Sequence, residues 1–312
     1  MKAIRRIFLS FFLAALFPTL LISSPTPNAE ARPTYNVQFK LIKIMGSFGS
    51  GRGQFTDPTT IILDGKILYI CDSGNNRIVK LDTDLNWLDS FSVLPEDLYK
   101  LDYPLGLIVD NSRILWVADT RNNRLVGFSD QGEFVRTFGE FGISAGTFNQ
   151  PKGLGLDISG NIYVCDNGND RVQVVDNKGT FIREFGQTGP LQERLQSPLQ
   201  LSVMPDGMVA VSDTHSPPLK FFDSFGNFRQ AFLTSSPNVI TRPTGFSQDN
   251  YKNLYVADSA SGKVVYFSLE KSTILGVITE GLREPYGIAT VRDLVFVTDK
   301  KRHQLLVFRK QR

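Results

Sequence analysis

The chain has 312 residues but only two cysteines and two histidines: Cys71, Cys165, His215 and His303. Catalytic zinc sites usually take three protein ligands, and histidine is prominent among them. Two histidines fall short of such a set, so the sequence disfavours zinc chemistry. It also has no Gly-x-Ser-x-Gly nucleophile elbow, no clustered cysteine–histidine pair and no phosphate-binding loop. No constellation typical of an enzyme is present in the sequence.

Long hydrophobic runs are equally scarce, and the main one lies at the start of the chain. Three basic residues precede an apolar run from Ile7 to Ile22, and Ala29-Glu30-Ala31 follows shortly after. This is the layout of a secretory signal peptide, and we predict a leader over residues 1–31. A retained anchor is the alternative, but a run of about 16 residues is short of the roughly 20 that span a bilayer. We expect no membrane span after cleavage, and a periplasmic or secreted protein.

Neither sign of charge is in excess. The formal net charge is +3, from 34 basic and 31 acidic residues, and the predicted leader holds three of the basic residues and one acidic residue. The remaining chain would carry a net charge of +1, which creates no long-range field that attracts nucleic acid or acidic lipid. We therefore expect no nucleic-acid partner.

What the chain has in abundance is repetition. Six aspartates recur after a hydrophobic segment at intervals of 41–47 residues: Asp72, Asp119, Asp166, Asp213, Asp258 and Asp299. A proline precedes each aspartate by 14 or 15 residues: Pro58, Pro104, Pro151, Pro198, Pro243 and Pro285. Two markers that stay in phase six times indicate one structural unit repeated along the chain.

The positions before each aspartate are chemically uniform. The residue two positions before is β-branched in all six copies, which is typical of a strand. The residue directly before is always small, and this column includes Cys71 and Cys165. A small residue fits where neighbouring sheets approach closely, and a cysteine there behaves as a small hydrophobe. Because the two cysteines lie two repeats apart, we predict free, buried thiols rather than a disulfide.

Each unit divides into four short strands joined by turns of Gly, Asn and Asp. In the third repeat we expect strands over 153–157, 162–165, 172–176 and 181–185. Four antiparallel strands per repeat are typical of a propeller blade, whereas solenoid units of this period carry helices or one strand each. We predict an all-β, six-bladed β-propeller with four-stranded antiparallel blades, a single domain over residues 32–312.

The two ends of the repeat region complement each other. The last repeat provides only three strands before the chain ends, whereas residues 37–48 look like the fourth strand of the other repeats. We therefore predict that this N-terminal strand pairs into the C-terminal blade, which joins the ring and removes two open sheet edges.

The repeated unit resembles the NHL repeat, whose pattern runs Phe-Gly, Pro, apolar-Val-Ala-Asp and Asn-Asn-Arg. The segment Trp116-Val117-Ala118-Asp119-Thr120-Arg121-Asn122-Asn123-Arg124 is nearly ideal, and Phe48-Gly49 opens another good copy. The resemblance covers residues 37 to 309 and implies a secreted bacterial NHL propeller. It says little about activity, because these residues hold the blade together.

The Asp and Arg columns are interpreted as structural. Each aspartate can accept hydrogen bonds from loop amides, and a basic residue five positions later can pair with it. The pairs with arginine are Asp72 with Arg77, Asp119 with Arg124, and Asp166 with Arg171. Lys263 serves the fifth repeat, whereas the fourth and sixth repeats have no basic residue at this spacing.

The residues after the prolines are candidates for ligand binding. They enter the innermost strand and should ring the mouth of the central channel: Thr59, Leu105, Lys152, Leu199, Thr244 and Tyr286. Their variety fits a surface that packing does not dictate, so we interpret them as a candidate ligand funnel, with a solvated rim as the alternative. No catalytic residue and no metal ligand is assigned.

Three classes of function are compatible with such a propeller. NHL propellers commonly present one face to a partner, and we expect a non-catalytic, monomeric binding module for a protein or carbohydrate ligand, without a cofactor. The alternative is a metal-dependent lyase or a lactonase-like hydrolase that uses the central channel, for which calcium would need oxygen ligands. A sensory or scaffold ectodomain is the third class.

Overall fold

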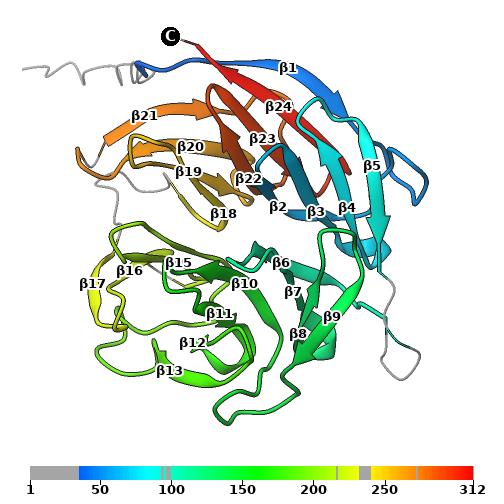
Figure 1. Ribbon diagram of the computed structural model, residues 1–312. Helices are drawn as coiled ribbons and strands as arrows, with labels where there is room; N and C mark the ends of the chain where they lie inside the picture. Colours follow the sequence, from blue (N-terminus) through cyan, green and yellow to red (C-terminus); the bar gives the residue numbers. More distant parts are fainter. Residues whose placement is uncertain are drawn as a thin grey trace, which may run out of the picture. The chain divides into compact units, whose positions relative to one another are not determined.

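A computed structural model describes residues 35–92, 95, 100–215, 217–231, 240–271 and 273–311. Within these ranges the chain forms six four-stranded sheets and three single-turn 3-10 helices. Figure 1 shows the sheets arranged around a common centre. The prediction of an all-β, six-bladed propeller with antiparallel blades is confirmed. The predicted leader, residues 1–31, lies outside the described residues.

The first three blades follow the same plan, with the innermost strand first. Blade one contains β2 (Pro58–Asp64), β3 (Ile67–Asp72), β4 (Arg77–Asp82) and β5 (Trp87–Phe91). Blade two contains β6 (Pro104–Val109), β7 (Leu115–Asp119), β8 (Arg124–Phe128) and β9 (Phe134–Phe138). Blade three contains β10 (Pro151–Leu156), β11 (Ile162–Asp166), β12 (Arg171–Val175) and β13 (Phe181–Phe185). A 3-10 turn follows each second strand: η1 (Ser73–Asn75), η2 (Thr120–Asn122) and η3 (Asn167–Asn169).

The other three blades keep the strand order but vary in length. Blade four has the shortest strands: β14 (Leu201–Val203), β15 (Val209–Ser212), β16 (Leu219–Phe222) and β17 (Phe228–Ala231). Blade five contains β18 (Pro243–Gln248), β19 (Asn253–Asp258), β20 (Lys263–Ser268) and β21 (Thr273–Ile278). Blade six contains β22 (Pro285–Val291), β23 (Leu294–Asp299), β24 (Gln304–Lys310) and, from the other end of the chain, β1 (Phe39–Met45).

The ring closes through β1. This strand runs antiparallel to β24, from Phe39 opposite Lys310 to Met45 opposite Leu305. The innermost strands also contact one another in an unbroken circle, from β2 through β6, β10, β14, β18 and β22 back to β2. The predicted closure of the C-terminal blade by the N-terminal strand is confirmed, and it leaves no gap in the circle of inner strands.

The hydrophobic core is divided among the interfaces between blades. Six buried clusters occur in the described chain, and each draws its residues from two neighbouring blades. One of them joins Ile70 and Val79 of blade one to Phe296 and Leu305 of blade six. Because each blade buries its faces only against its neighbours, the stability of every blade depends on the closed ring.

Close approach near the axis explains the small-residue column. All six residues that precede the aspartates are fully buried: Cys71, Ala118, Cys165, Ser212, Ala257 and Thr298. Glycines two residues after the prolines serve the same packing, since a Cβ on Gly106 or Gly245 would collide with the carbonyl oxygen of Lys152 or Tyr286 in the next blade. Both cysteines are free and buried, as predicted.

Candidate functional site

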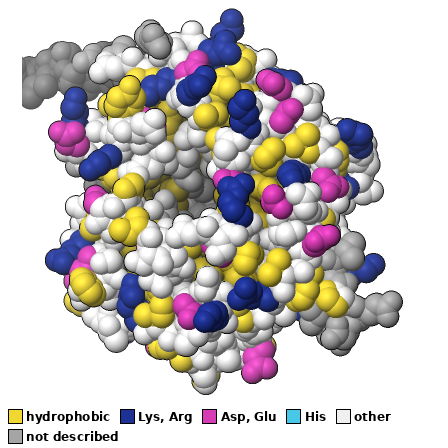
Figure 2. All heavy atoms as spheres, viewed as in Figure 1, with side chains coloured by type: hydrophobic (Ala, Val, Ile, Leu, Met, Phe, Trp, Pro, Cys, Tyr) yellow, Lys and Arg dark blue, Asp and Glu magenta, His cyan; other side chains and the backbone are white. Residues whose placement is uncertain are grey.

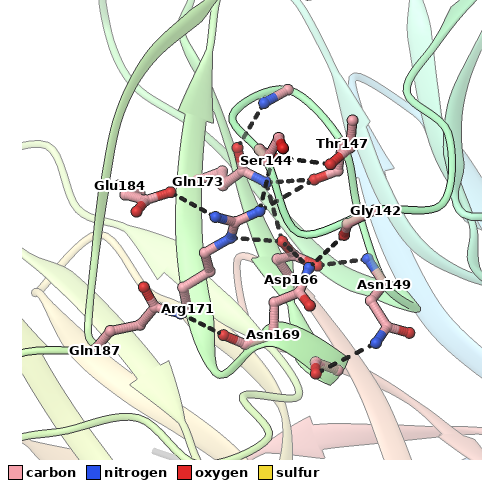
Figure 3. A network of polar contacts seen from close by, with 12 residues as sticks. Gly142, Ser144, Thr147, Asn149, Asp166, Asn169, Arg171, Gln173, Glu184 and Gln187 are labelled. Carbon is pink, nitrogen blue, oxygen red and sulfur yellow. Dashed lines mark hydrogen bonds and ion pairs between the residues drawn. The ribbon is translucent and has the colours of Figure 1, made fainter.

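The three Asp–Arg pairs hold the loops at one face of the ring. The carboxylates of Asp72, Asp119 and Asp166 are fully buried and lie 2.8, 2.8 and 2.7 Å from the Nε atoms of Arg77, Arg124 and Arg171. Figure 3 shows the third copy, in which Asp166 also accepts hydrogen bonds from the Asn149 backbone amide and from the Gln173 side chain, at 2.7 and 3.0 Å. The aspartate and arginine side chains of these pairs are bonded to other groups of the protein, which fits a structural role.

Burial dominates the electrostatics of two of these carboxylates. It raises the pKa of Asp72 and of Asp119, and the amide and guanidinium donors around each carboxylate offset only part of that rise. Neither group is aimed at solvent or at a cavity, so the shift reflects packing rather than catalysis.

In the fourth blade the structure corrects the sequence interpretation, which found no basic partner for Asp213. The Lys220 ammonium lies 2.8 Å from the Asp213 carboxylate, and both side chains are buried. Lys220 pairs across the sheet with Val211, just as Gln173 pairs with Val164 in blade three. Lys220 follows its aspartate by seven residues, whereas the arginines of the first three blades follow by five. A search at a fixed spacing of five residues could therefore not find it.

A second polar contact links neighbouring blades. The residue that ends each regular post-aspartate turn has a left-handed φ near +55° and accepts a hydrogen bond from the amide of the next pre-proline residue. The acceptors are Asn76 for Tyr103, Asn123 for Gln150, and Asp170 for Ser197, at 2.9, 2.8 and 2.7 Å. His303 completes the set, since its Nδ1 accepts from the Asp57 amide at 3.1 Å.

Where no such acceptor is available, the pre-proline amide donates to the aspartate of its own blade. Gly262 ends the fifth turn and has no side chain, and the Glu284 amide donates instead to its own Asp299 at 3.1 Å. The Arg242 amide, which follows the irregular fourth turn, likewise donates to Asp258 at 2.9 Å. The inter-blade bond therefore depends on the side chain that ends the preceding turn.

We call the side of the ring where the innermost strands begin, at the prolines, the proline face. The six predicted funnel residues all lie at this end of the inner strands, but with different exposure. Three are buried and three are half-buried: first Thr59, Leu105 and Thr244, then Lys152, Leu199 and Tyr286. Thr59 is engaged with the Ser73 hydroxyl at 2.6 Å, and Thr244 donates to the Pro285 carbonyl at 3.2 Å.

A cavity of about 340 Å³ opens beside them on the proline face, between blades six and one. Its lining residues are Asp57, Glu284, Lys300, Lys301 and His303. Tyr103 adjoins it, with its hydroxyl 3.4 Å from the Asp57 carboxylate and its ring centroid 5.7 Å from the Lys300 ammonium. The sequence interpretation assigned no carboxylate to the channel mouth. The signal that it missed is the residue before each proline, which supplies Asp57, Tyr103 and Glu284.

The charged groups at this mouth perturb one another. Burial lowers the pKa of Lys152, and the nearby Lys300 ammonium contributes in the same direction. Burial also opposes the charge of Lys300, but Tyr103, Asp57 and Glu284 outweigh it and raise the pKa of Lys300. Burial and the neighbouring Tyr103 raise the pKa of Tyr286. Groups from four blades therefore act on one small region, which can bind a polar ligand.

A second cavity, of about 310 Å³, lies further along the axis. All six innermost strands line it. One lining residue from each strand is, in chain order, Thr60, Leu107, Leu154, Leu201, Phe246 and Ile288. Figure 2 shows one face of the molecule, where basic and acidic side chains are interspersed around a central hollow. Among the described residues, no charged side chain lines this cavity, so the charged groups at the proline face mark the better candidate for a specific site.

Within the described ranges, no group of three or more His, Cys, Asp and Glu side chains is placed to hold a metal ion. Across the same residues, no helix has the length and apolar character required to cross a membrane.

The fold and these loops together define a six-bladed β-propeller with repeated Asp–Arg turns. The NHL repeat model matches residues 101–128 and 148–175, which correspond to blades two and three. The chain therefore contains NHL repeats within a six-bladed propeller. A comparison with curated proteins found no match.

Solved structures with the same architecture have diverse functions. Virginiamycin B lyase from Staphylococcus aureus is 13% identical with a TM-score of 0.62, over 87% of this chain and 99% of the lyase chain. Hydrazine synthase from Kuenenia stuttgartiensis is 12% identical with a TM-score of 0.61, over 84% of this chain and 99% of that chain. A chain of a nidogen–laminin complex is 19% identical with a TM-score of 0.59, over 74% of this chain and 85% of that chain. At these identities the similarity establishes the fold alone.

Proposed function

We propose that the protein is an exported, non-catalytic binding propeller that presents its proline face to a protein or carbohydrate ligand. The observation that carries the proposal is the cavity beside Asp57, Glu284 and Lys300, together with Lys152, which has no hydrogen-bond or ion-pair partner in the described part of the chain. Burial lowers the pKa of this ammonium, so a ligand that brings a hydrogen-bond acceptor or a negative charge to it would be favoured. The nidogen–laminin complex is an example of this fold in a protein assembly.

The cellular setting follows from the leader predicted over residues 1–31. We propose that the protein acts as a monomer in the periplasm or outside the cell. Mass spectrometry of the protein recovered from a membrane-free periplasmic or culture fraction should give a new N-terminus at Arg32. A chain that stays in the membrane fraction with Met1 intact would contradict export by cleavage.

The binding proposal can be tested with a panel of defined polysaccharides and peptides. We expect at least one of them to bind the purified protein without chemical change, and Tyr103→Ala to weaken binding. Tyr251→Ala is the matched control, because Tyr251 is 79% exposed in the turn between β18 and β19, at the opposite end of the inner strands. Equal effects of the two substitutions would argue against the proline face, and conversion of the ligand to a new product would overturn the non-catalytic role.

A metal-dependent lyase or lactonase-like hydrolase is the second candidate. It is favoured by the similarity to virginiamycin B lyase and by the two carboxylates of Asp57 and Glu284 at one cavity, although these two and His303 are not placed to hold a metal ion as a group of three. Carboxylate oxygens suit calcium, and these two would be its first ligands. Stoichiometric calcium after dialysis, with turnover of a lactone or of a streptogramin that chelation abolishes, would favour this candidate. Binding that is unchanged by chelation, without turnover, would favour the binding role.

A further inference from the structure

One column of the repeat changes character in blade six. The residue directly after each aspartate is short in five copies: Ser73, Thr120, Asn167, Thr214 and Ser259. In the first three blades this side chain donates to the proline carbonyl of the next blade, at 2.6, 2.8 and 2.9 Å. The sixth copy has Lys300, which makes no such bond and instead lies over the Tyr103 ring at the cavity. Blade packing therefore does not account for a lysine here.

Lys152 is the second exception. It is the only charged residue among the six that follow the prolines, and it lies near enough to Lys300 for the two charges to influence each other. Two like charges in a half-buried region repel, and no carboxylate of the described residues pairs with Lys152. A ligand that carries negative charge would relieve this repulsion.

The charge balance of the mouth sets the size of that negative charge. Lys152, Lys300 and Arg242 are opposed by Asp57 and Glu284, and Arg242 lies 3.5 Å from the Glu284 carboxylate. One positive charge is left over, and the exposed Lys301, which also lines the cavity, adds a second. A ligand with one compact anionic group suits this small excess, whereas a polyphosphate would meet repulsion from both carboxylates.

The hydrogen-bonding groups around the cavity favour a ligand that carries hydroxyl groups. The Asp57 carboxylate accepts from the Tyr103 hydroxyl and the Glu284 carboxylate lies beside Arg242. Their remaining lone pairs can only accept hydrogen bonds, so ligand groups that reach them should be donors. The phenols of Tyr103 and Tyr286 add polar tips to flat apolar rings. We propose that the channel mouth binds a carboxylate-bearing sugar, with its carboxylate between Lys152 and Lys300 and its hydroxyls toward Asp57 and Glu284. This assignment rests on the proposed binding role of the proline face.

The test compares trigalacturonate with its methyl ester, which keeps the sugar and removes the charge. By isothermal titration calorimetry we expect the acid to bind and the ester to bind about tenfold more weakly or not at all. Lys152→Met and Lys300→Met should each reduce the affinity for the acid by about tenfold, because each removes one charge partner. Lys178→Met, in an exposed turn of blade three, should leave it unchanged.

The other outcomes separate the two proposals. Equal affinity for acid and ester, with no effect of the lysine variants, would overturn the anion site and leave a binding role at the proline face intact. If an acidic peptide binds at Lys152 and Lys300 and trigalacturonate does not, the sugar assignment would be overturned. If neither trigalacturonate nor any member of the wider panel binds, both proposals fail. The unfolding curve of Lys152→Met should match the wild type or exceed it in stability, so its loss of binding would not reflect misfolding. Lys300→Met should stay folded with a small loss of stability, because it removes favourable contacts with Tyr103, Asp57 and Glu284.

Discussion

At the scale of single residues, the contact between His303 and Asp57 joins the last blade to the first on the proline face. The bond is equivalent to those of Asn76 and Asn123, but an imidazole replaces the amide. To accept a hydrogen bond at Nδ1, the ring must carry its proton on Nε2. The Phe48 ring packs against this imidazole at 5.0 Å between centroids, which helps to fix its orientation.

We expect His303→Ala to lower the free energy of unfolding by about 1 kcal/mol, the usual net value of one neutral hydrogen bond. His303→Asn should retain most of the stability, because asparagine makes the same bond at the equivalent positions and tolerates a left-handed φ. Urea denaturation of the two variants provides the comparison. An equal loss in both would show that the bond is not what His303 contributes.

Lys152 should make the free energy of unfolding depend on pH in the alkaline range. Because its pKa is lowered in the folded protein, the folded state binds fewer protons than the unfolded state between that lowered value and the ordinary value of 10.5. The free energy of unfolding should therefore rise with pH across this window. Lys152→Met should remove the rise and increase stability at neutral pH, whereas the exposed Lys178→Met should do neither. Thermal unfolding measured from pH 7 to 11 checks the sign.

At the scale of secondary-structure elements, β1 has the most consequential position. It covers the edge of β24, and its residues Phe39 and Leu41 pack against the cluster between blades five and six. Phe39 also makes edge contacts with the rings of Tyr255 and Tyr266, at 6.0 and 5.9 Å between centroids. Loss of this strand would expose both a sheet edge and one interface between blades.

Deletion of residues 32–48 should therefore cause severe loss of thermal stability. A milder pair of substitutions separates packing from chain length: Leu41→Ala should cost about 2 kcal/mol, because it removes the packing of a partly buried side chain against this cluster. Ile42→Ala, at a side chain that is 40% exposed, should stay within about 0.5 kcal/mol. Unchanged stability after the deletion would mean that the ring does not need β1.

At the scale of the whole molecule, the closed circle of interfaces should make unfolding cooperative. Cys71 and Cys165 lie in blades one and three, both fully buried, and burial raises the pKa of each thiol well above its ordinary value. We expect both thiols to react with a soluble thiol reagent only through global unfolding, and hence at the same rate. Mass spectrometry of partly labelled protein in low denaturant measures the two rates. Much faster labelling of one cysteine would show that part of the ring opens independently.

Periodicity carried most of the information about the fold. The Asp and Pro columns predicted the strands of blade three to within about two residues, and the missing fourth strand of the last repeat predicted the pairing of β1 with β24. Both follow from chain-local rules, since β-branched and small residues alternate with turn residues at each copy. The lysine of blade four was missed because an irregular loop shifted its position along the strand.

The channel mouth was only partly accessible to sequence reasoning. The sequence by itself determined the repeat, the blades, the closing strand and Lys152 as a member of the inner ring, because each depends on residues close together in one copy. The tertiary structure alone decided that Asp57, Lys152, Glu284, Lys300 and His303 belong to one region. These residues come from copies far apart in the chain, and only the curvature of the ring and the reach of long side chains bring their charges together.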